Sequence, residues 1–119
     1  MTSDPLADQL AGWGTVAIIE TTGRVTGRPV RAAVGFIEEA DGSLLVAAGD
    51  PEADWAHNLE ADPRCLVTIA ERVSARRAET LTGADRNATI AGLILRYGTP
   101  SEGLGRGPAF RLRQADEGT

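Results

Sequence analysis

Short runs of apolar residues recur along the first half of the chain, separated by clusters of glycine, proline and charged residues. The nearly continuous apolar run at 15–21 predicts a strand that is buried on both faces or lies inside a barrel, and the run at 30–38 predicts a second strand. Asp41-Gly42 is the strongest short-range hairpin signal in the chain. It leads into a third predicted strand at 43–48, so this half of the chain is predicted to form an antiparallel meander.

Three more strands are predicted in the second half of the chain. The segments 64–69 and 73–81 are expected to pair as a hairpin. Residues 109–113 alternate between apolar and polar, which places Phe110 and Leu112 on one face of a closing strand. Six short strands with few helices predict a small antiparallel barrel of the mainly-β class.

Helices are predicted at three places. A short helix is expected at 5–11. A second is expected at 50–61, with Asp50 as its N-cap and a proline in its first turn. A third is expected at 82–98, with Thr82 as its cap and a glycine at its end. The fold class is therefore six or so antiparallel strands with two to three helices.

Length and composition favour one domain with a modest core. The 119 residues are 42% hydrophobic, and we expect a single domain over 1–119, with an N-terminal segment at 1–13 and a flexible tail at 114–119. The net charge of -5 argues against a nucleic-acid partner. The sequence contains no recognisable signal peptide and no apolar run of membrane-spanning length, so a cytoplasmic protein is the default expectation.

The residue inventory restricts the chemistry that side chains can perform. All 12 basic residues are arginines, which excludes Schiff-base chemistry on lysine. One cysteine, Cys65, and one histidine, His57, make neither an intrachain disulfide nor a closed metal site, so no metal ligands are expected. No serine lies in a nucleophile-elbow sequence. If the protein is an enzyme, a bound cofactor is expected to carry the chemistry.

Residues 20–31, between the first two predicted strands, are the most distinctive stretch of the chain. Two glycines allow the backbone to bend sharply, and Arg24, Arg28 and Arg31 place three cations within eight residues. Free N–H groups, hydroxyls and guanidinium groups suit a small anionic ligand that carries phosphate or carboxylate. The alternative is a long hairpin connection whose arginines are merely solvated.

The predicted helix at 50–61 carries an unusual buried stripe. Trp55, Asn58 and Leu59 share one face because they are spaced three and four residues apart. A buried asparagine must find hydrogen-bond partners or cost about 1–3 kcal/mol. Two interpretations remain equally open: the Asn58 amide at the helix end bonds a nearby loop carbonyl, or it contacts a ligand.

Three motifs together resemble a known family. They are Thr-Thr-Gly-Arg-Val-Thr-Gly-Arg-Pro at 21–29, Trp-Ala-His-Asn-Leu at 55–59, and Asp-Pro-Arg at 62–64. In order and spacing they resemble the deazaflavin-dependent nitroreductases, the nitroreductase and quinone reductase family. The resemblance implies a split β-barrel, related to the flavin-binding barrels of pyridoxine-phosphate oxidases. It also implies that the protein binds coenzyme F420 and passes hydride to quinones, nitroaromatics or enoates.

The resemblance assigns contacts by position. It implies that Arg24, Thr26 and Gly27 hold the cofactor's phosphate and its polyglutamate tail, while the end of the third strand lies along the deazaflavin ring. Tyr97, after the last helix, would supply a hydroxyl on the substrate side. The full set of implied cofactor contacts is Arg24, Thr26, Gly27, Arg31, Ala47, Ala48, Gly49, Trp55 and Asn58.

Two positions depart from the family pattern. Val25 stands where many relatives have a lysine, and the acidic segment 49–54 replaces a second lysine. Carboxylates near an anionic cofactor weaken its binding through like-charge repulsion. FMN binding, or a non-redox barrel that binds a small ligand or acts as an enzyme without a cofactor, therefore remain alternatives to an F420-dependent reductase.

A homodimer is also expected, because a small split barrel leaves sheet surface uncovered. The apolar segments 34–37 and 65–69 are the candidate contact surfaces. In this interpretation Val67 faces outward from its strand.

Overall fold

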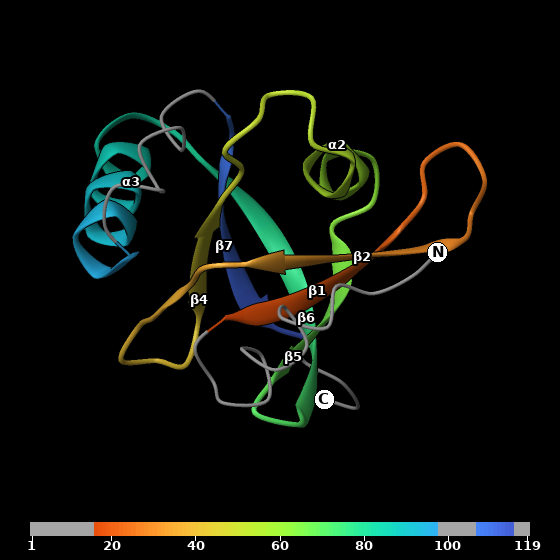
Figure 1. The fold of residues 1–119 in the computed structure, drawn as a ribbon, viewed down its shortest axis with the longest axis horizontal. Coiled ribbons are helices and arrows are strands. Elements are labelled where there is room, and N and C mark those ends of the chain that lie inside the picture. The colour runs from red at the N-terminus through yellow and green to blue at the C-terminus, as the bar shows by residue number, and fades with distance from the viewer. Residues whose placement is uncertain (1–15, 98–106, 116–119) are drawn as a thin grey trace.

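A single antiparallel sheet of seven strands forms the framework of the protein. The computed structural model describes residues 16–97 and 107–115. Its strands follow the order β2-β1-β5-β6-β7-β4-β3 and curl into a half-barrel with two helices beside it (Figure 1). The predicted mainly-β fold is confirmed. The predicted helix at 5–11 lies outside the described residues.

The sheet is built from hairpins. β1 (Ala17–Thr22) pairs with β2 (Pro29–Val34), and β5 (Arg64–Ile69) pairs with β6 (Arg72–Leu81). β1 also pairs with β5, which joins the two hairpins. The last strand, β7 (Ala109–Gln114), then inserts between β6 and β4, and this pairing curls the sheet around one core.

The strand predicted at 30–38 is divided into two. β2 ends at Val34, and β3 (Ile37–Glu38) leaves β1 to pair with β4 (Leu44–Ala47) at the other edge of the sheet. The break lies at Gly35. The Tyr97 ring packs so closely against this glycine that a Cβ on it would come within 2.8 Å of Tyr97 Cε2. The tyrosine hydroxyl also accepts a hydrogen bond of 3.0 Å from the Phe36 N–H.

The second predicted helix begins later than Asp50. Helix α2 (Asp54–Ala61) starts after Ala53, which supplies no side-chain cap. Asp50 Oδ1 instead accepts a 2.9 Å hydrogen bond from the Glu52 N–H, and the Ala53 N–H bonds the Asp50 carbonyl, so the aspartate closes a separate turn. The competing local bond explains why the N-cap prediction was wrong.

Helix α3 (Gly83–Tyr97) follows Thr82 as predicted and covers the outer face of the sheet at β4 and β7. It buries Ile90 and Leu93 against a small cluster with Ala47 and Leu81. Neither described helix is long and apolar enough to cross a membrane.

Most of the core lies inside the barrel. Alternate residues of β1, β4, β5 and β7 point inward, and α2 closes one end with Trp55, Ala56 and Leu59. The Trp55 ring packs against the Phe110 ring at a centroid distance of 5.9 Å. Trp55 is therefore mainly a core residue, since only 8% of it is exposed.

Strand β5 faces the opposite way from the sequence interpretation. Val67 is 1% exposed and belongs to the barrel core, while its neighbour Leu66 is 41% exposed on the outer face. A one-residue error in phase reverses every side chain of a strand. Any contact surface on this strand must therefore involve Leu66 rather than Val67.

Charge substitutions at these two neighbours test the facing of β5. Val67→Glu is expected to lower the free energy of unfolding by at least about 3 kcal/mol, because it places an unpaired carboxylate in the core. Leu66→Glu is expected to change it by less than about 1 kcal/mol, because that side chain reaches solvent. Urea denaturation compares the two variants, and equal losses would contradict the assigned facing.

Candidate functional site

The turn between β1 and β2 is closed by its own hydrogen bonds. The Gly23 N–H donates to the Arg28 carbonyl and the Gly27 N–H donates to the Gly23 carbonyl, each at 2.8 Å. Thr26 Oγ1 accepts from the Arg28 N–H at 3.2 Å. Gly27 has φ of 74°, a left-handed conformation that favours glycine. These hydrogen bonds and the left-handed glycine hold the backbone of the turn in one conformation.

Asn58 of α2 joins this turn to β1. Its Oδ1 accepts hydrogen bonds from the Arg24 backbone N–H at 3.1 Å and from Arg24 Nη1 at 2.8 Å. Its Nδ2 donates to Thr21 Oγ1 at 3.1 Å. Asn58 is 1% exposed, so its amide is committed to the protein itself. The amide bonds a nearby loop, as one interpretation expected, but its partners are the Arg24 N–H and the Thr21 hydroxyl rather than a loop carbonyl.

Arg24 continues the connection to α2. Nη1 also donates to the Asp54 carbonyl at 3.4 Å, and Nη2 donates to Asp54 Oδ1 at 3.3 Å. Because the Asp54 side chain is well exposed, its ion pair with Arg24 adds little stability by itself. Its effect is to hold the guanidinium against the helix.

The expectation of free N–H groups in the turn needs correction. Gly23, Arg24, Gly27 and Arg28 all donate their backbone hydrogens within the protein. The Val25 and Thr26 N–H groups have no acceptor among the described residues and remain available to an anion. The guanidinium groups of Arg28 and Arg31, which form no hydrogen bond or ion pair with the described residues, are available as well. Both residues are exposed.

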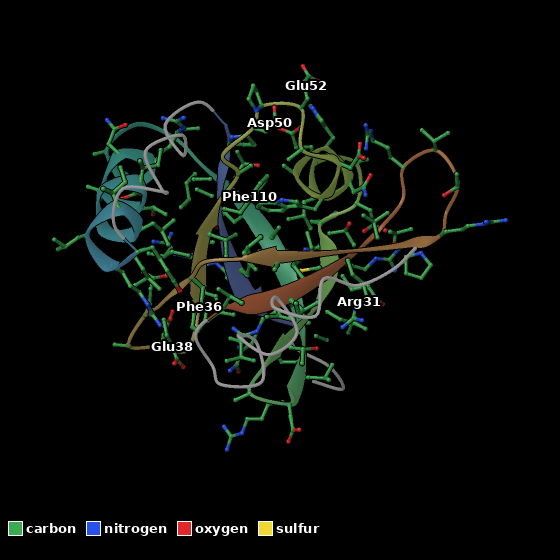
Figure 2. The ribbon with its side chains drawn as sticks, viewed as in Figure 1. Arg31, Phe36, Glu38, Asp50, Glu52 and Phe110 are labelled. Atoms are coloured by element: carbon green, nitrogen blue, oxygen red, sulfur yellow. The ribbon has the colours of Figure 1, made fainter. Side chains whose placement is uncertain are left out.

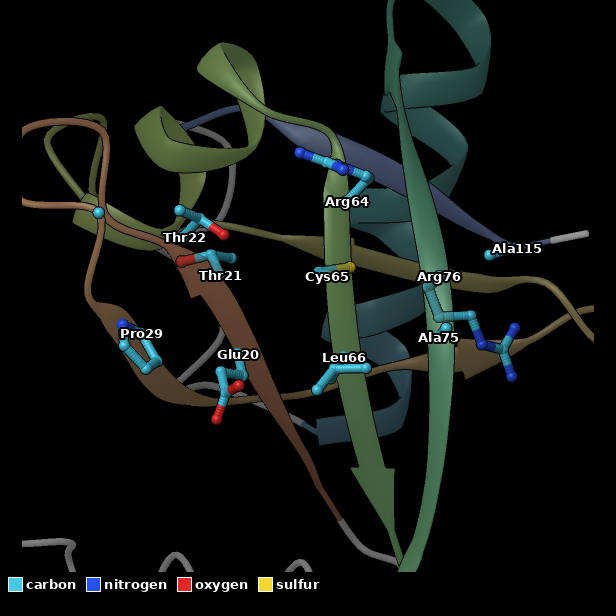
Figure 3. Close-up of a pocket in the computed structure, with 11 residues that line it drawn as sticks. Glu20, Thr21, Thr22, Pro29, Arg64, Cys65, Leu66, Ala75, Arg76 and Ala115 are labelled. Atoms are coloured by element: carbon cyan, nitrogen blue, oxygen red, sulfur yellow. The ribbon is translucent and has the colours of Figure 1, made fainter. Parts of the chain in front are cut away.

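A groove runs along the outer face of the sheet beside the turn (Figure 3). It has a volume of about 480 Å³. Gly27 and Pro29 border it at the turn, and Leu66 and Ala75 form part of its apolar lining. Glu20 of β1 stands opposite Arg31 in the β1–β2 register, so Arg31 projects on the same outer face.

Arg64 borders the groove with its charge already paired. Its Nε and Nη2 donate to the two oxygens of Asp62 at 3.1 and 3.0 Å. Hydrogen bonds from the Arg64 side chain and backbone hold the pKa of the Asp62 carboxyl below its ordinary value. The pair is exposed and remains ionised at neutral pH.

Cys65 contributes no nucleophile to this groove. Burial raises the pKa of its thiol to about 12, so the thiolate is scarce at neutral pH. No cluster of His, Cys, Asp and Glu side chains that could hold a metal occurs within 16–97 and 107–115. His57 contacts Glu60 at 3.2 Å on the exposed side of α2.

The end of β4 is largely covered. Ala47 and Ala48 are buried, and the Ala48 N–H donates to the Pro108 carbonyl at 2.9 Å. Gly107 lies so close to the Ala48 carbonyl that a Cβ would collide with it. Gly49 is exposed, so a flat ring beside this strand end would meet Gly49 rather than the alanine side chains.

Tyr97 lies apart from the turn. It ends α3, on the opposite side of the molecule from the β1–β2 connection (Figure 1). Its hydroxyl lies 3.3 Å from the Phe36 carbonyl as well as bonding the Phe36 N–H. The structure thus brings Arg24, Thr26 and Gly27 of the turn together with Asn58, but not with Tyr97, and the Trp55 ring packs into the core against Phe110 instead.

The sequence interpretation missed two residues that help to hold the β1–β2 turn against α2. Thr21 is 2% exposed and receives the Asn58 amide, and Asp54 anchors the Arg24 side chain. Thr21 occupies an inward position of β1 two residues after Ile19, so the two-residue alternation of the strand could have predicted that its side chain is buried. Asp54 gave no comparable signal, because its contact depends on where the turn folds.

Comparison with known families gives a direct match. The model of a family described as F420H(2)-dependent quinone reductase matches residues 2–98. No curated protein matches the chain.

Several solved structures share the fold. An F420-H2 dependent reductase, FDR-A, is 24% identical, with a TM-score of 0.70 over 83% of this chain and 94% of that one. HutZ, a heme storage protein from Vibrio cholerae, is 20% identical, with a TM-score of 0.70 over 97% and 92%. A structure described as a domain-swapped dimer is 21% identical, with a TM-score of 0.69 over 91% and 94%. At these identities the likeness shows the fold alone.

Substitution of Asn58 tests the link between α2 and the turn. Asn58→Leu is expected to lower the free energy of unfolding by about 2–4 kcal/mol, because the Thr21 hydroxyl and the Arg24 N–H lose their buried partner. Asn58→Asp is the matched control. Its carboxylate still accepts from Arg24, so its loss at neutral pH should be roughly half as large or less. Urea denaturation that gave equal losses, or none for leucine, would contradict the link.

Proposed function

The chain belongs to the family of F420H(2)-dependent quinone reductases, and we propose that it is itself an oxidoreductase that uses reduced F420. Its proposed hydride acceptors are a quinone, a nitroaromatic or an activated enone. The observation that carries the proposal is the family match over residues 2–98, which includes the turn and the whole of α2. The FDR-A likeness in fold supports it.

Residues at the turn fit the anionic part of F420. Arg28 and Arg31 are exposed cations on the connection that Asn58 holds in place, so their guanidinium groups are available to phosphate or carboxylate oxygens. We assign Arg24 and Asn58 to holding the turn and Thr26 and Gly27 to shaping it. When bound, reduced F420 supplies the hydride.

The remaining residues orient the reactants. Gly49 offers exposed backbone just after β4, and Trp55, which is 8% exposed, lies in the first turn of α2. We propose that they border the ring of the cofactor while Ala47 and Ala48 support this wall from within. The protein's role is then to hold cofactor and acceptor together, since the hydride passes directly between them. We assign Tyr97 to positioning the β2–β3 bend.

The acidic approach to α2 is the specific observation that favours a second candidate. Asp50 and Glu52 lie exposed at the loop before α2 (Figure 2), and Asp54 is committed to Arg24. These carboxylates repel a polyglutamate tail, whereas FMN carries a single phosphate. FMN binding, or a small-ligand function without redox chemistry, is therefore the alternative proposal.

Binding and turnover decide between these functions. The purified protein is titrated with F420 by fluorescence and with FMN and haem by thermal shift, and reduced F420 is then mixed with menadione. We expect F420 to bind and its reduced form to be oxidised by menadione only when the protein is present. Stabilisation by FMN without F420 binding would favour the second candidate, and no response to either would reject both redox functions.

Arginine variants locate the cofactor. Arg28→Gln is expected to weaken F420 binding by about 1.5–3 kcal/mol, the range of charge-assisted hydrogen bonds, without lowering stability. Arg72→Gln, at the start of β6, removes the same charge at another place and serves as the control. Equal affinities of both variants and the parent would show that the turn does not hold the anionic tail.

We also propose a homodimer through the outer face of the sheet around Leu66. Its 41% exposure leaves apolar surface there, and one fold neighbour is described as a domain-swapped dimer. Light scattering at micromolar concentration gives the mass directly, and a mass near one chain would refute the dimer.

A further inference from the structure

A second arginine-rich cavity lies at the other end of the barrel. Arg76 of β6 is only 8% exposed and points inward from the strand. Its Nε donates to Ser74 Oγ at 3.0 Å, and its Nη1 donates to the carbonyls of Gly42 and Leu112 at 2.6 and 3.3 Å. All three acceptors are neutral.

The charge of Arg76 has no counter-ion within the described ranges 16–97 and 107–115. No carboxylate there lies within ion-pair distance of its guanidinium. Burying an unpaired charge is costly, and buried charges in proteins are usually paired. Every fully buried side-chain nitrogen or oxygen in the described part of the chain has a partner, so Nη2, which has none, is the atom that reaches accessible space.

Arg76 borders a cavity of about 620 Å³, within the size range of small-molecule sites, and it also borders the outer groove. Along β6, residues 72, 74 and 76 point to one side because a strand alternates its faces. Arg72, Ser74 and Arg76 thus place two cations and a hydroxyl on one wall. Leu44 of β4 and Ile69, which pairs with Arg72 across the β5–β6 hairpin, add apolar lining, and Glu38 is the one acid among the residues that border the cavity.

We propose that this cavity binds a small carboxylate with an apolar body. The carboxylate would accept from Arg76 Nη2 and the Arg72 guanidinium, which supplies the missing counter-ion. The Ser74 oxygen already accepts from Arg76, so its hydroxyl hydrogen can donate to the same carboxylate. The apolar body would lie against Leu44 and Ile69.

This site is distinct from the proposed cofactor site. Figure 2 shows Glu38 at the lower end of the molecule, while Asp50 and Glu52 mark the loop before α2 at the upper end. Arg76 borders both hollows, but the lower cavity extends to the β5–β6 connection at Ala70, whereas the outer groove extends to the turn at Gly27. Binding here is therefore expected to be independent of F420.

Three probes separate the contribution of the carboxylate to binding from that of the apolar body. Octanoate has both parts, acetate lacks the apolar chain, and octan-1-ol lacks the carboxylate. Octanoate and acetate are titrated into isotope-labelled protein to about 20 mM, and octan-1-ol, which is sparingly soluble in water, to about 3 mM. Two-dimensional NMR follows the arginine Nε–H signals at matched concentrations. We expect octanoate to bind with a Kd on the order of 1 mM and to shift the Arg76 signal. Acetate and octan-1-ol should bind at least about 10-fold more weakly, because each makes half of the contacts.

Two arginines on opposite faces of β6 provide matched variants. Arg72→Gln is expected to weaken octanoate binding about 10-fold, whereas Arg77→Gln, on the outer face, should change it less than about 2-fold. Glu38→Gln should tighten binding, because it removes the one negative charge that borders the cavity. None of these substitutions alters a buried side chain, so the folded state is retained.

Three results would overturn the proposal. They are an absence of octanoate binding, equal binding of octan-1-ol, and equal weakening by Arg72→Gln and Arg77→Gln. Arg28→Gln should leave octanoate binding unchanged, so a failure at this cavity is distinguishable from a failure of the F420 proposal.

Discussion

The buried amide of Asn58 is the interaction on which the proposed site depends. It connects helix α2, the turn at Arg24 and the inner face of β1 at Thr21, which lie far apart in sequence. A side chain that is 1% exposed must satisfy both its oxygen and its nitrogen within the protein, and only this placement of the turn does so. The exposed cations of the turn are therefore positioned by a buried polar contact rather than by the turn alone.

The half-barrel separates two arginine environments. At α2, the Arg24 guanidinium donates to neutral oxygens of Asp54 and Asn58 and to the Asp54 carboxylate, and these bonds hold the turn against the helix. At the far end, Arg76 is held by neutral oxygens and retains an unbalanced charge. The packed core between them, with Phe110 and Ile19 fully buried, keeps the two ends apart. One small fold thus presents arginine side chains in two surroundings of different shape and polarity.

Sequence periodicity and turn signals predicted the strands, the β5–β6 hairpin and the buried stripe of α2. What they missed depends on distant contacts. The break after Val34 requires Tyr97, 61 residues beyond its Phe36 partner. The facing of Val67 and the burial of Arg76 beside the exposed Arg77 depend on register with neighbouring strands, which a short polar segment does not reveal. The acceptor of the Arg24 N–H likewise could not be predicted without knowing where Asn58 lies.

Native-state hydrogen exchange of the Arg24 backbone N–H tests the central claim most directly. This hydrogen belongs to an exposed turn and is protected only by its bond to Asn58 Oδ1. We predict that its exchange is slowed roughly 100-fold or more in the parent protein and that Asn58→Leu removes this protection while the Ile19 N–H of β1 stays slow. Exchange of the Arg24 N–H at the unprotected rate in the parent protein would contradict the account.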